Sequence, residues 1–278
     1  TWTNDNSSIG LPLTGSDDIL NIAMTNTSNV SQVATIVVTP TFDNGGISCT
    51  GPSKTFTITI NPAAQVNPIS SQVVCNGDST TSILFSTSNT SGTTTYSWTN
   101  DNTSIGLAAA GSADNIGSFP VTNTSTIPQV ATLVVTPTYT FNGKDCTGSP
   151  ETFTITVNPS AQIDQPTSLN ICEGEIVSAI NFTTLNTVGT TTYDWANDNA
   201  NIGLALNGVD GINSFTALNS TGTPQVATIT VTPTFTNGLV PCTGNPKSFT
   251  ITVNPSAQVN PIGSTTVCAG DLIPKIEF

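Results

Sequence analysis

Three short clusters of Asn and Asp carry the polar groups best suited to holding a ligand. An Asn-Asp-Asn triplet occurs at residues 4–6, 100–102 and 197–199, and a second acid follows each triplet. Calcium takes about six to eight oxygen ligands, so two converging loops could supply part of a site. Under this hypothesis, four acids are candidate metal ligands: Asp101, Asp114, Asp198 and Asp210. The alternative is turn chemistry, because Asn and Asp bond to their own backbone in tight turns, and EF-hand spacing is missing.

The composition excludes several other classes of chemistry. The chain has no histidine, and all four of its basic residues are lysines. Histidine-dependent nucleophilic catalysis and imidazole metal sites are therefore excluded, as is a bidentate arginine clamp for phosphate or carboxylate. A net charge of −13 disfavours binding to nucleic acid or anionic lipid. We expect no enzyme, no cofactor other than calcium, no nucleic-acid partner and no membrane insertion.

The elements that position these residues repeat along the chain. Trp2, Trp98 and Trp195 are spaced by 96 and 97 residues, and the closing phrase TFTITINP returns as TFTITVNP and SFTITVNP. A period near 97 residues suits a β-sandwich with its own core. The Asn-Pro phrases predict the following boundaries: a partial module at 1–62 that lacks its first two strands, complete modules at 63–159 and 160–255, and the first strands of a further module at 256–278.

Period-2 alternation predicts the strands and the buried face of each module. Ile and Phe recur in Ile-Leu-Phe, Ile-Asn-Phe and Ile-Glu-Phe while the middle residue varies, so the outer pair points inward. In the first complete module we expect seven strands, with the tryptophan in the third: 65–75, 80–86, 94–99, 104–109, 115–122, 129–140 and 151–158. This pattern predicts an all-β fold of tandem immunoglobulin-like sandwiches, about seven strands per module.

The recurring phrases YxWTNDNxSIGL, VATxxVTPTF, CTGxP and FTITVNP resemble the PKD-like, immunoglobulin-like modules of very large secreted Bacteroidetes proteins. Those proteins carry such modules in long tandem arrays, often ahead of a sorting domain for type IX secretion or gliding motility. The resemblance implies an extracellular or cell-surface location and an adhesin-like stalk. It implies no catalytic residue.

Near-identical modules favour a structural role, a semi-rigid rod in an extracellular fibre or adhesin stalk, because a stalk requires the same shape many times. The expected partners are copies of the chain arranged head to tail in a filament or long array, with lateral self-association and O-linked glycans as further hypotheses. We expect the incomplete modules at both ends to be completed by another copy or by a continuation of the chain. The alternatives are a carbohydrate- or surface-binding module, or an accessory domain array of a larger secreted enzyme.

Two cysteines per module in an extracellular repeat suggest disulfides. Cys75 ends the first strand and Cys146 lies in the last hairpin, on the order of 30 Å away in a sandwich. A disulfide requires Cα atoms within about 7 Å. In a head-to-tail array, Cys75 would instead meet Cys242 of the next module. Pairing within modules, Cys75 with Cys146 and Cys172 with Cys242, stays open because a strand that switched sheets would reverse the geometry.

Overall fold

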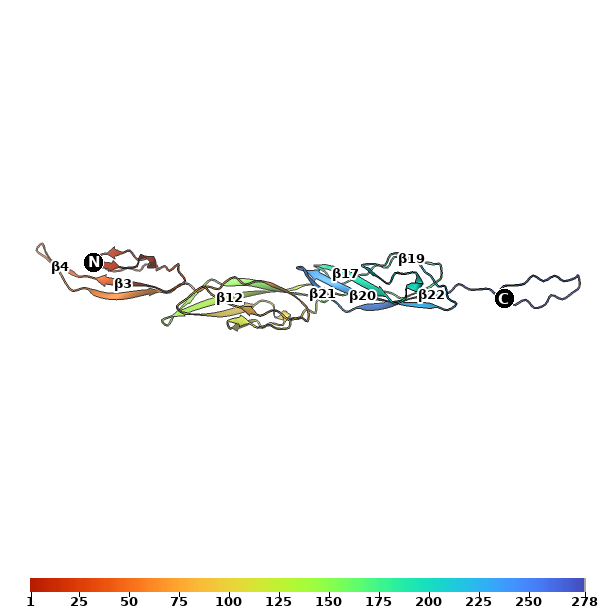
Figure 1. Ribbon diagram of the computed structural model, residues 1–278. Helices are drawn as coiled ribbons and strands as arrows, with labels where there is room; N and C mark the ends of the chain where they lie inside the picture. The colour runs from red at the N-terminus through yellow and green to blue at the C-terminus, as the bar shows by residue number, and fades with distance from the viewer. Residues whose placement is uncertain (278) are drawn as a thin grey trace. The chain divides into compact units, whose positions relative to one another are not determined.

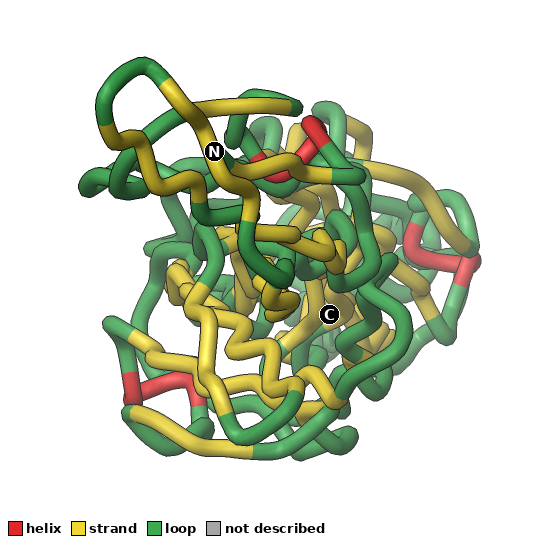
Figure 2. The backbone as a smooth tube through the Cα atoms, turned by 90° about the vertical axis from the view of Figure 1, so that its left-hand side faces the viewer, coloured by secondary structure: helices red, strands yellow, loops and turns green. Residues whose placement is uncertain are grey.

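The computed structural model describes residues 1–277 and divides into two compact units, Thr1–Pro159 and Ser160–Phe278 (Figure 1). The described residues form strands and three single turns of 3-10 helix (Figure 2). No helix in this part of the chain has the length and hydrophobicity needed to cross a membrane. The predicted all-β fold is confirmed.

Residues 63–159, in the first unit, form a sandwich of one large sheet and one short ladder. Its strands are β7 (Gln72–Cys75), β8 (Ile83–Leu84), β9 (Thr93–Asn100), β10 (Ala110–Ser112), β11 (Asn115–Ile116), β12 (Gln129–Phe141), β13 (Lys144–Thr147) and β14 (Glu151–Asn158). The large sheet has the order β10-β9-β12-β14-β7, with β13 paired to β12, and β11 pairs with β8 in the second layer. Strand β7 runs parallel to β14.

The core lies between these two layers. Alternate residues of β12 point inward, so that Ala131, Leu133 and Val135 are fully buried. The Trp98 ring packs directly over Gly111 of the neighbouring strand β10, where a Cβ atom would come within 2.5 Å of the ring. The tryptophan of the third strand therefore requires glycine opposite it in β10, because any larger residue there would collide with the ring.

Residues 160–255, in the second unit, repeat this arrangement. The strands are β15 (Leu169–Cys172), β16 (Ile176–Val177), β17 (Thr190–Asn197), β18 (Asn207–Val209), β19 (Phe215–Thr216), β20 (Gln225–Asn237), β21 (Val240–Thr243) and β22 (Lys247–Asn254). The large sheet has the order β15-β22-β20-β17-β18, and β16 pairs with β19. Gly208 lies under Trp195 as Gly111 lies under Trp98.

Residues 1–62 form a smaller sheet in the order β2-β1-β3-β6, and β4 pairs with β5 in a separate hairpin. The bounds are β1 (Trp2–Asn4), β2 (Thr14–Gly15), β3 (Gln32–Val38), β4 (Thr41–Asn44), β5 (Ile47–Thr50) and β6 (Lys54–Ile60). The sequence predicts that this partial module, taken alone, exposes Trp2, Ile36, Val38, Phe56 and Ile58. Trp2 and Ile36 are buried instead, because the loop residues Ile9 and Leu11 pack over them, and Val38 and Ile58 are half-buried.

The last strand of the partial module stays uncovered on one side. Phe56 of β6 is 45% exposed, whereas its equivalent Phe153 in β14 is 3% exposed. Residues 256–277 form no strand, although the sequence predicts the opening strands of a module there. Phe278, the last residue of the predicted strand, lies outside the described residues.

Some of the predicted strand boundaries are wrong. The expected strand at 104–109 is a 3-10 turn, η2 (Thr103–Ile105), closed by Gly106 in the left-handed region at φ 98°. The strands predicted at 65–75, 80–86 and 115–122 shrink to four, two and two residues. Strands β10 and β13 are additional. The segments at 94–99, 129–140 and 151–158 are confirmed as strands β9, β12 and β14, with the tryptophan in the third strand.

Candidate functional site

The Asn-Asp-Asn triplet of the 63–159 module begins where β9 ends, and the side chain of its first residue, Asn100, is buried. Asn100 is on the same face of β9 as Trp98, because alternate residues of a strand share a face. Its Nδ2 donates hydrogen bonds to the carbonyl oxygens of Asn102, Leu107 and Ala108, each at 3.2 Å. One amide group thus satisfies three backbone acceptors of the following loop.

The other two members of the triplet are also committed to the backbone. Asn102 caps η2, with its Oδ1 accepting from the backbone N–H of Ser104 at 3.1 Å. The Asp101 carboxylate accepts from the backbone N–H of Thr132 in β12 at 2.7 Å. The triplet is therefore a structural anchor that ties the loop to the central strand.

The other modules repeat this anchor. Asp198 accepts from the Thr228 N–H at 2.7 Å, and Asp5 from the Thr35 N–H at 2.6 Å. The bond from Thr35 holds the pKa of Asp5 below its ordinary value of 3.8. A carboxylate that accepts a backbone N–H is stabilised in its charged form.

The second acid of each module does not meet the triplet. The backbone N–H of Asp210 bonds to the Tyr193 carbonyl at 2.6 Å, while Asp198 lies five residues beyond Tyr193, just past the end of β17 and roughly 17 Å away. Ligand oxygens of one calcium ion lie within about 5 Å of each other. A single ion shared by Asp198 and Asp210 is therefore not supported by the geometry.

The same separation holds in the 63–159 module. The β9–β10 register pairs Ser112 with Ser97, which places Asp114 near Tyr96 and away from Asp101. Burial, and then the nearby negative charge of Asp114, raise the pKa of Tyr96 above its usual range. Among residues 1–277, no group of three or more His, Cys, Asp or Glu side chains is placed to hold a metal. Calcium binding at any one of these acids stays a prediction.

The cysteines occupy two chemical states. Cys75 and Cys242 are disulfide-bonded, whereas Cys49, Cys146, Cys172 and Cys268 carry free thiols. The pairing within modules, Cys75 with Cys146 and Cys172 with Cys242, is therefore wrong for this structure.

Sheet register explains why Cys75 cannot reach Cys146. Cys75 lies opposite Asn158 at the end of β14, near the Gln129 end of β12. Cys146 lies opposite Tyr139, ten residues further along β12 and about 33 Å away. The pairing of Cys75 with Cys242 stays a prediction.

Asparagine also fixes the segments that lead into the two complete modules. Asn89 accepts from the Gln65 N–H at 2.7 Å and donates to the Ala63 carbonyl at 3.1 Å. Its equivalent Asn186 accepts from the Gln162 N–H at 2.6 Å. Neither residue was predicted from the sequence, where the available signal is an Asn at equivalent places in both modules.

Within the first unit, residues 1–62 contact the β12–β13 hairpin of the following module. Asn61 Nδ2 donates to the carbonyls of Phe141 and Lys144 at 3.1 and 3.4 Å. The Thr90 N–H donates to the Asn29 carbonyl at 2.9 Å. Gly148 approaches the linker so closely that a Cβ atom there would lie 1.7 Å from the Ala64 carbonyl oxygen. These contacts fix the junction with backbone as well as side-chain groups.

Two Asn-x-Ser triplets match the sequence signal for N-glycosylation, but their asparagine side chains are hydrogen-bonded to the backbone of their own modules. Asn123 is buried, and its Nδ2 donates to the Ile127 and Val157 carbonyls at 2.8 and 2.7 Å. Asn26 donates in the same way to the Val30 and Ile60 carbonyls, at 2.8 Å each. These amide nitrogens brace loops against the last strand of their modules.

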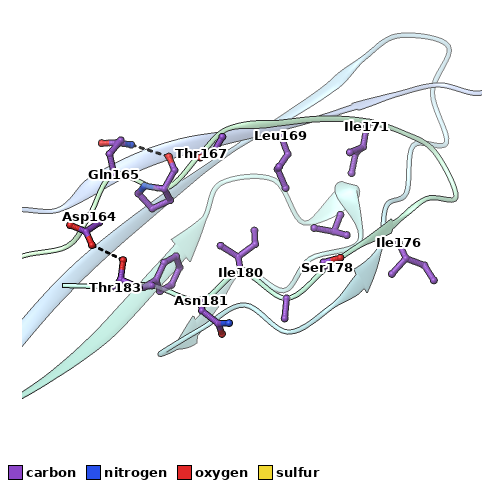
Figure 3. A pocket seen from close by; sticks show the side chains of 14 residues that line it. Asp164, Gln165, Thr167, Leu169, Ile171, Ile176, Ser178, Ile180, Asn181 and Thr183 are labelled. Atoms are coloured by element: carbon purple, nitrogen blue, oxygen red, sulfur yellow. Dashed lines mark hydrogen bonds between the residues drawn. The ribbon is translucent and has the colours of Figure 1, made fainter.

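A groove of about 510 Å³ opens in the 160–255 module (Figure 3). It lies between residues 164–171, which lead into β15, and residues 176–183, which begin with β16. Leu169 and Ile171 on one side and Ile180 on the other give it an apolar lining. At one end, Thr183 Oγ1 donates to Asp164 Oδ2 at 2.6 Å. The groove could not be predicted from the sequence, because its lining mixes Ile180 and Phe182, predicted to point inward, with polar loop residues that follow no motif.

A profile of the PKD-like domain family matches residues 72–161 and 169–257. No curated protein matches the chain.

Among solved structures, the three N-terminal domains of the bacteriophage RB49 outer capsid protein Hoc align over 82% of this chain and 95% of that chain, with 7% identity and a TM-score of 0.43. Human protocadherin-24 EC1-2 aligns over 71% of this chain and 100% of that chain, with 10% identity and a TM-score of 0.39. Mouse cadherin-23 EC22-24 aligns over 84% and 79%, with 12% identity and a TM-score of 0.33.

Proposed function

Because this chain belongs to the PKD-like domain family, we propose that it is a structural segment of an extracellular fibre or adhesin stalk. In this role, successive modules stack head to tail into a semi-rigid rod that holds another part of the protein away from a surface. The repeat itself supports the proposal, since a spacer needs many copies of one shape rather than one distinctive site.

The observation that carries the proposal is the junction inside the first unit. Asn61 and Asn29 of one module bond to the next module, and Asn89 of that next module bonds to the linker between them. Free rotation about the linker would break these bonds. A freely jointed array would not need an asparagine dedicated to its linker, so the junction supports a stiff connection.

A covalent tie between modules is a second part of the proposal. We place it between Cys75 of one module and Cys242 of the next, as the head-to-tail arrangement predicts. In support, both cysteines are disulfide-bonded, while Cys146 and Cys172 are free thiols. Asn61, which contacts the hairpin carrying Cys146, is the repeat equivalent of Asn158, which lies opposite Cys75. The same junction geometry, repeated one module later, would bring Cys75 to the hairpin that carries Cys242.

Small-angle X-ray scattering of the chain tests the rod. We expect the cross-section and the maximum dimension of a stiff linear particle. The matched control inserts Gly-Ser-Gly-Ser after Pro62, which lengthens the linker with flexible residues, and should broaden the distance distribution. If the unmodified chain and the insertion variant scatter alike, the stiff junction is refuted.

A further inference from the structure

The groove beside β15 belongs to the 160–255 module alone, because a glutamine side chain crosses the same place in the 63–159 module. Gln72 of β7 is the repeat equivalent of Leu169 of β15, since each is the first residue of its ladder with the parallel last strand. The Gln72 Nε2 donates to the Thr81 carbonyl at 3.1 Å, and its Oε1 accepts from the Thr81 N–H at 3.0 Å. One carboxamide group thus bridges the two sides of that module.

Leu169 cannot form this bridge, because its side chain has no hydrogen-bonding group. The residue across the groove is Ser178, the repeat equivalent of Thr81. Among residues 1–277, no group forms a hydrogen bond with the Ser178 backbone N–H or carbonyl. The same two groups of Thr81 point to Gln72, so those of Ser178 point into the groove as a donor and an acceptor without a protein partner.

Loss of the bridge also opens apolar surface. The equivalent hollow of the 63–159 module is about 390 Å³ and does not reach Phe85. The groove of the 160–255 module is about 510 Å³ and extends to Phe182, the equivalent aromatic residue. Phe85 is 4% exposed, whereas Phe182 is half-buried. The groove can therefore take up an apolar side chain next to the unpaired backbone groups.

The groove carries a negative charge that its counterpart lacks. Asp164 is the one charged residue of its lining (Figure 3), and the repeat equivalent of Asp164 is the neutral Asn67. Thr183 donates to Asp164 Oδ2, and Oδ1 has no hydrogen-bond partner within residues 1–277. The chain as a whole has a net charge of −13. Electrostatic complementarity therefore favours a ligand with a basic group near Asp164.

The bridge in the 63–159 module indicates which polar group the groove accepts. A primary carboxamide carries its donor and its acceptor side by side, so it can bond to the N–H and the carbonyl of one backbone residue at once. The trans amide of an acetylated sugar has its N–H and carbonyl on opposite sides and cannot form both bonds. Glutamine side chains carry the primary carboxamide. The fitting ligand is therefore a polypeptide.

We propose that the groove of the 160–255 module binds an extended segment of a partner polypeptide through a glutamine side chain. The glutamine pairs with Ser178 as Gln72 pairs with Thr81. A neighbouring apolar side chain of the partner contacts the apolar lining, and a basic residue of the partner lies near Asp164. This binding role goes beyond the structural role proposed above and does not depend on the stiffness of the junctions between modules.

The site discriminates glutamine from side chains of similar size. Glutamate has no donor for the Ser178 carbonyl, and its charge is repelled by Asp164. Leucine would cover both backbone groups of Ser178 without pairing either, which costs the desolvation of two polar groups. Specificity therefore comes from the paired donor and acceptor, whereas the apolar lining contributes affinity.

Chemical-shift titration of the isotope-labelled chain tests the binding. The probes are the peptides acetyl-Lys-Val-Gln-Val-amide and acetyl-Val-Gln-Val-Lys-amide, which place the basic residue on either side of the glutamine. We expect a saturable shift of the Ser178 amide, with a dissociation constant on the order of 1 mM or below. Peptides with Glu in place of Gln should bind at least about tenfold more weakly. No saturable shift at Ser178 up to about 10 mM of either probe, or equal binding of the Glu peptides, would overturn the proposal.

Exchange of the two bridge residues between modules tests the role of the bridge. Leu169→Gln should close the groove and weaken binding at Ser178 by at least about tenfold, because its carboxamide competes with that of the peptide. Gln72→Leu should open the 63–159 module and add a saturable shift of the Thr81 amide. Each variant should fold, since each new residue occupies the equivalent place in the other module. Unchanged binding in Leu169→Gln, or a Thr81 shift in the unmodified chain, would contradict the proposal.

Asp164→Asn introduces the residue of the 63–159 module and tests the charged end of the groove. It should weaken binding of the lysine peptides by about threefold at low salt. Binding of the same peptides with Ala in place of Lys should stay unchanged. An equal loss for both sets of peptides would show that Asp164 acts only by holding Thr183, and would reject the basic residue as part of the ligand.

Discussion

The modules at 1–62 and 63–159 share their strand phrases but bury them differently. Strands β3 and β12 carry nearly the same sequence, and Ala34 and Ile36 are as fully buried as Ala131 and Leu133. The difference appears at the last strand, where the exposed Phe56 replaces the buried Phe153. The central strands therefore bury their face against local loops, whereas burial of the last strand depends on the segment that opens the module.

The same difference appears in the hairpin. Phe42 in β4 is 70% exposed, whereas Tyr139, its equivalent in β12, is fully buried. The loop at Gly92 covers the Tyr139 ring so closely that a Cβ atom would lie 2.5 Å from it. The opening segment of a module thus covers the hairpin end of the sheet as well as its last strand.

The largest expected effect is on core packing. Phe153→Ala should cost about 3–5 kcal/mol of the free energy of unfolding of its module, because the side chain is buried. Phe56→Ala should cost about 1 kcal/mol or less, since much of that side chain already contacts water. Native-state hydrogen exchange of the β12 and β3 amides measures the two modules separately. Equal losses would contradict the difference in burial.

A smaller loss in the free energy of unfolding is expected when the buried Asn100 side chain is removed. Asn100→Ala should cost about 2–3 kcal/mol, because it leaves three loop carbonyls without their donor. The control is Thr103→Ala, a change at an exposed neighbour in the same loop. Hydrogen exchange of the β9 amides measures both. A cost for Asn100→Ala no larger than for Thr103→Ala would refute the anchor.

The smallest expected effect is the pH dependence of the Asp5 anchor. The Thr35 N–H lowers the pKa of Asp5, so the stabilisation is fully present above the ordinary value of 3.8 and is lost as pH falls through the lowered pKa. The Thr35 amide proton shift should titrate with a midpoint below 3.8. Asp5→Asn should abolish this titration while keeping an acceptor for the amide. A midpoint at or above the ordinary value would contradict the assignment.

Strand alternation accounts for the parts of the fold that could be predicted. Strands β9, β12 and β14 combine β-branched residues with a clear period of two, so their faces could be assigned from residue type. The segment at 104–109 was wrongly predicted to be a strand, because its alternation coincides with a 3-10 turn that Asn102 caps and Gly106 closes. Local capping competes with strand formation there, and the hydrophobic pattern does not report it.

The candidate site was harder to predict because polar residues have more than one role. Asn and Asp triplets suit both ligands and turns, and only the structure shows that Asp101 is committed to the Thr132 N–H. One signal was available in the sequence. Tyr96, Trp98 and Asn100 alternate on one face of a strand, which places the asparagine with the core aromatics and indicates a buried anchor.

Single-molecule stretching of the chain, held at its two ends, tests the covalently braced rod most directly. If Cys75 and Cys242 are joined, the residues between them cannot extend under force. Addition of a reductant should then lengthen the fully unfolded chain by about 600 Å, at roughly 3.6 Å per released residue. Cys75→Ser should show the longer contour without reductant. An unmodified chain whose contour length is the same before and after reduction would contradict the account.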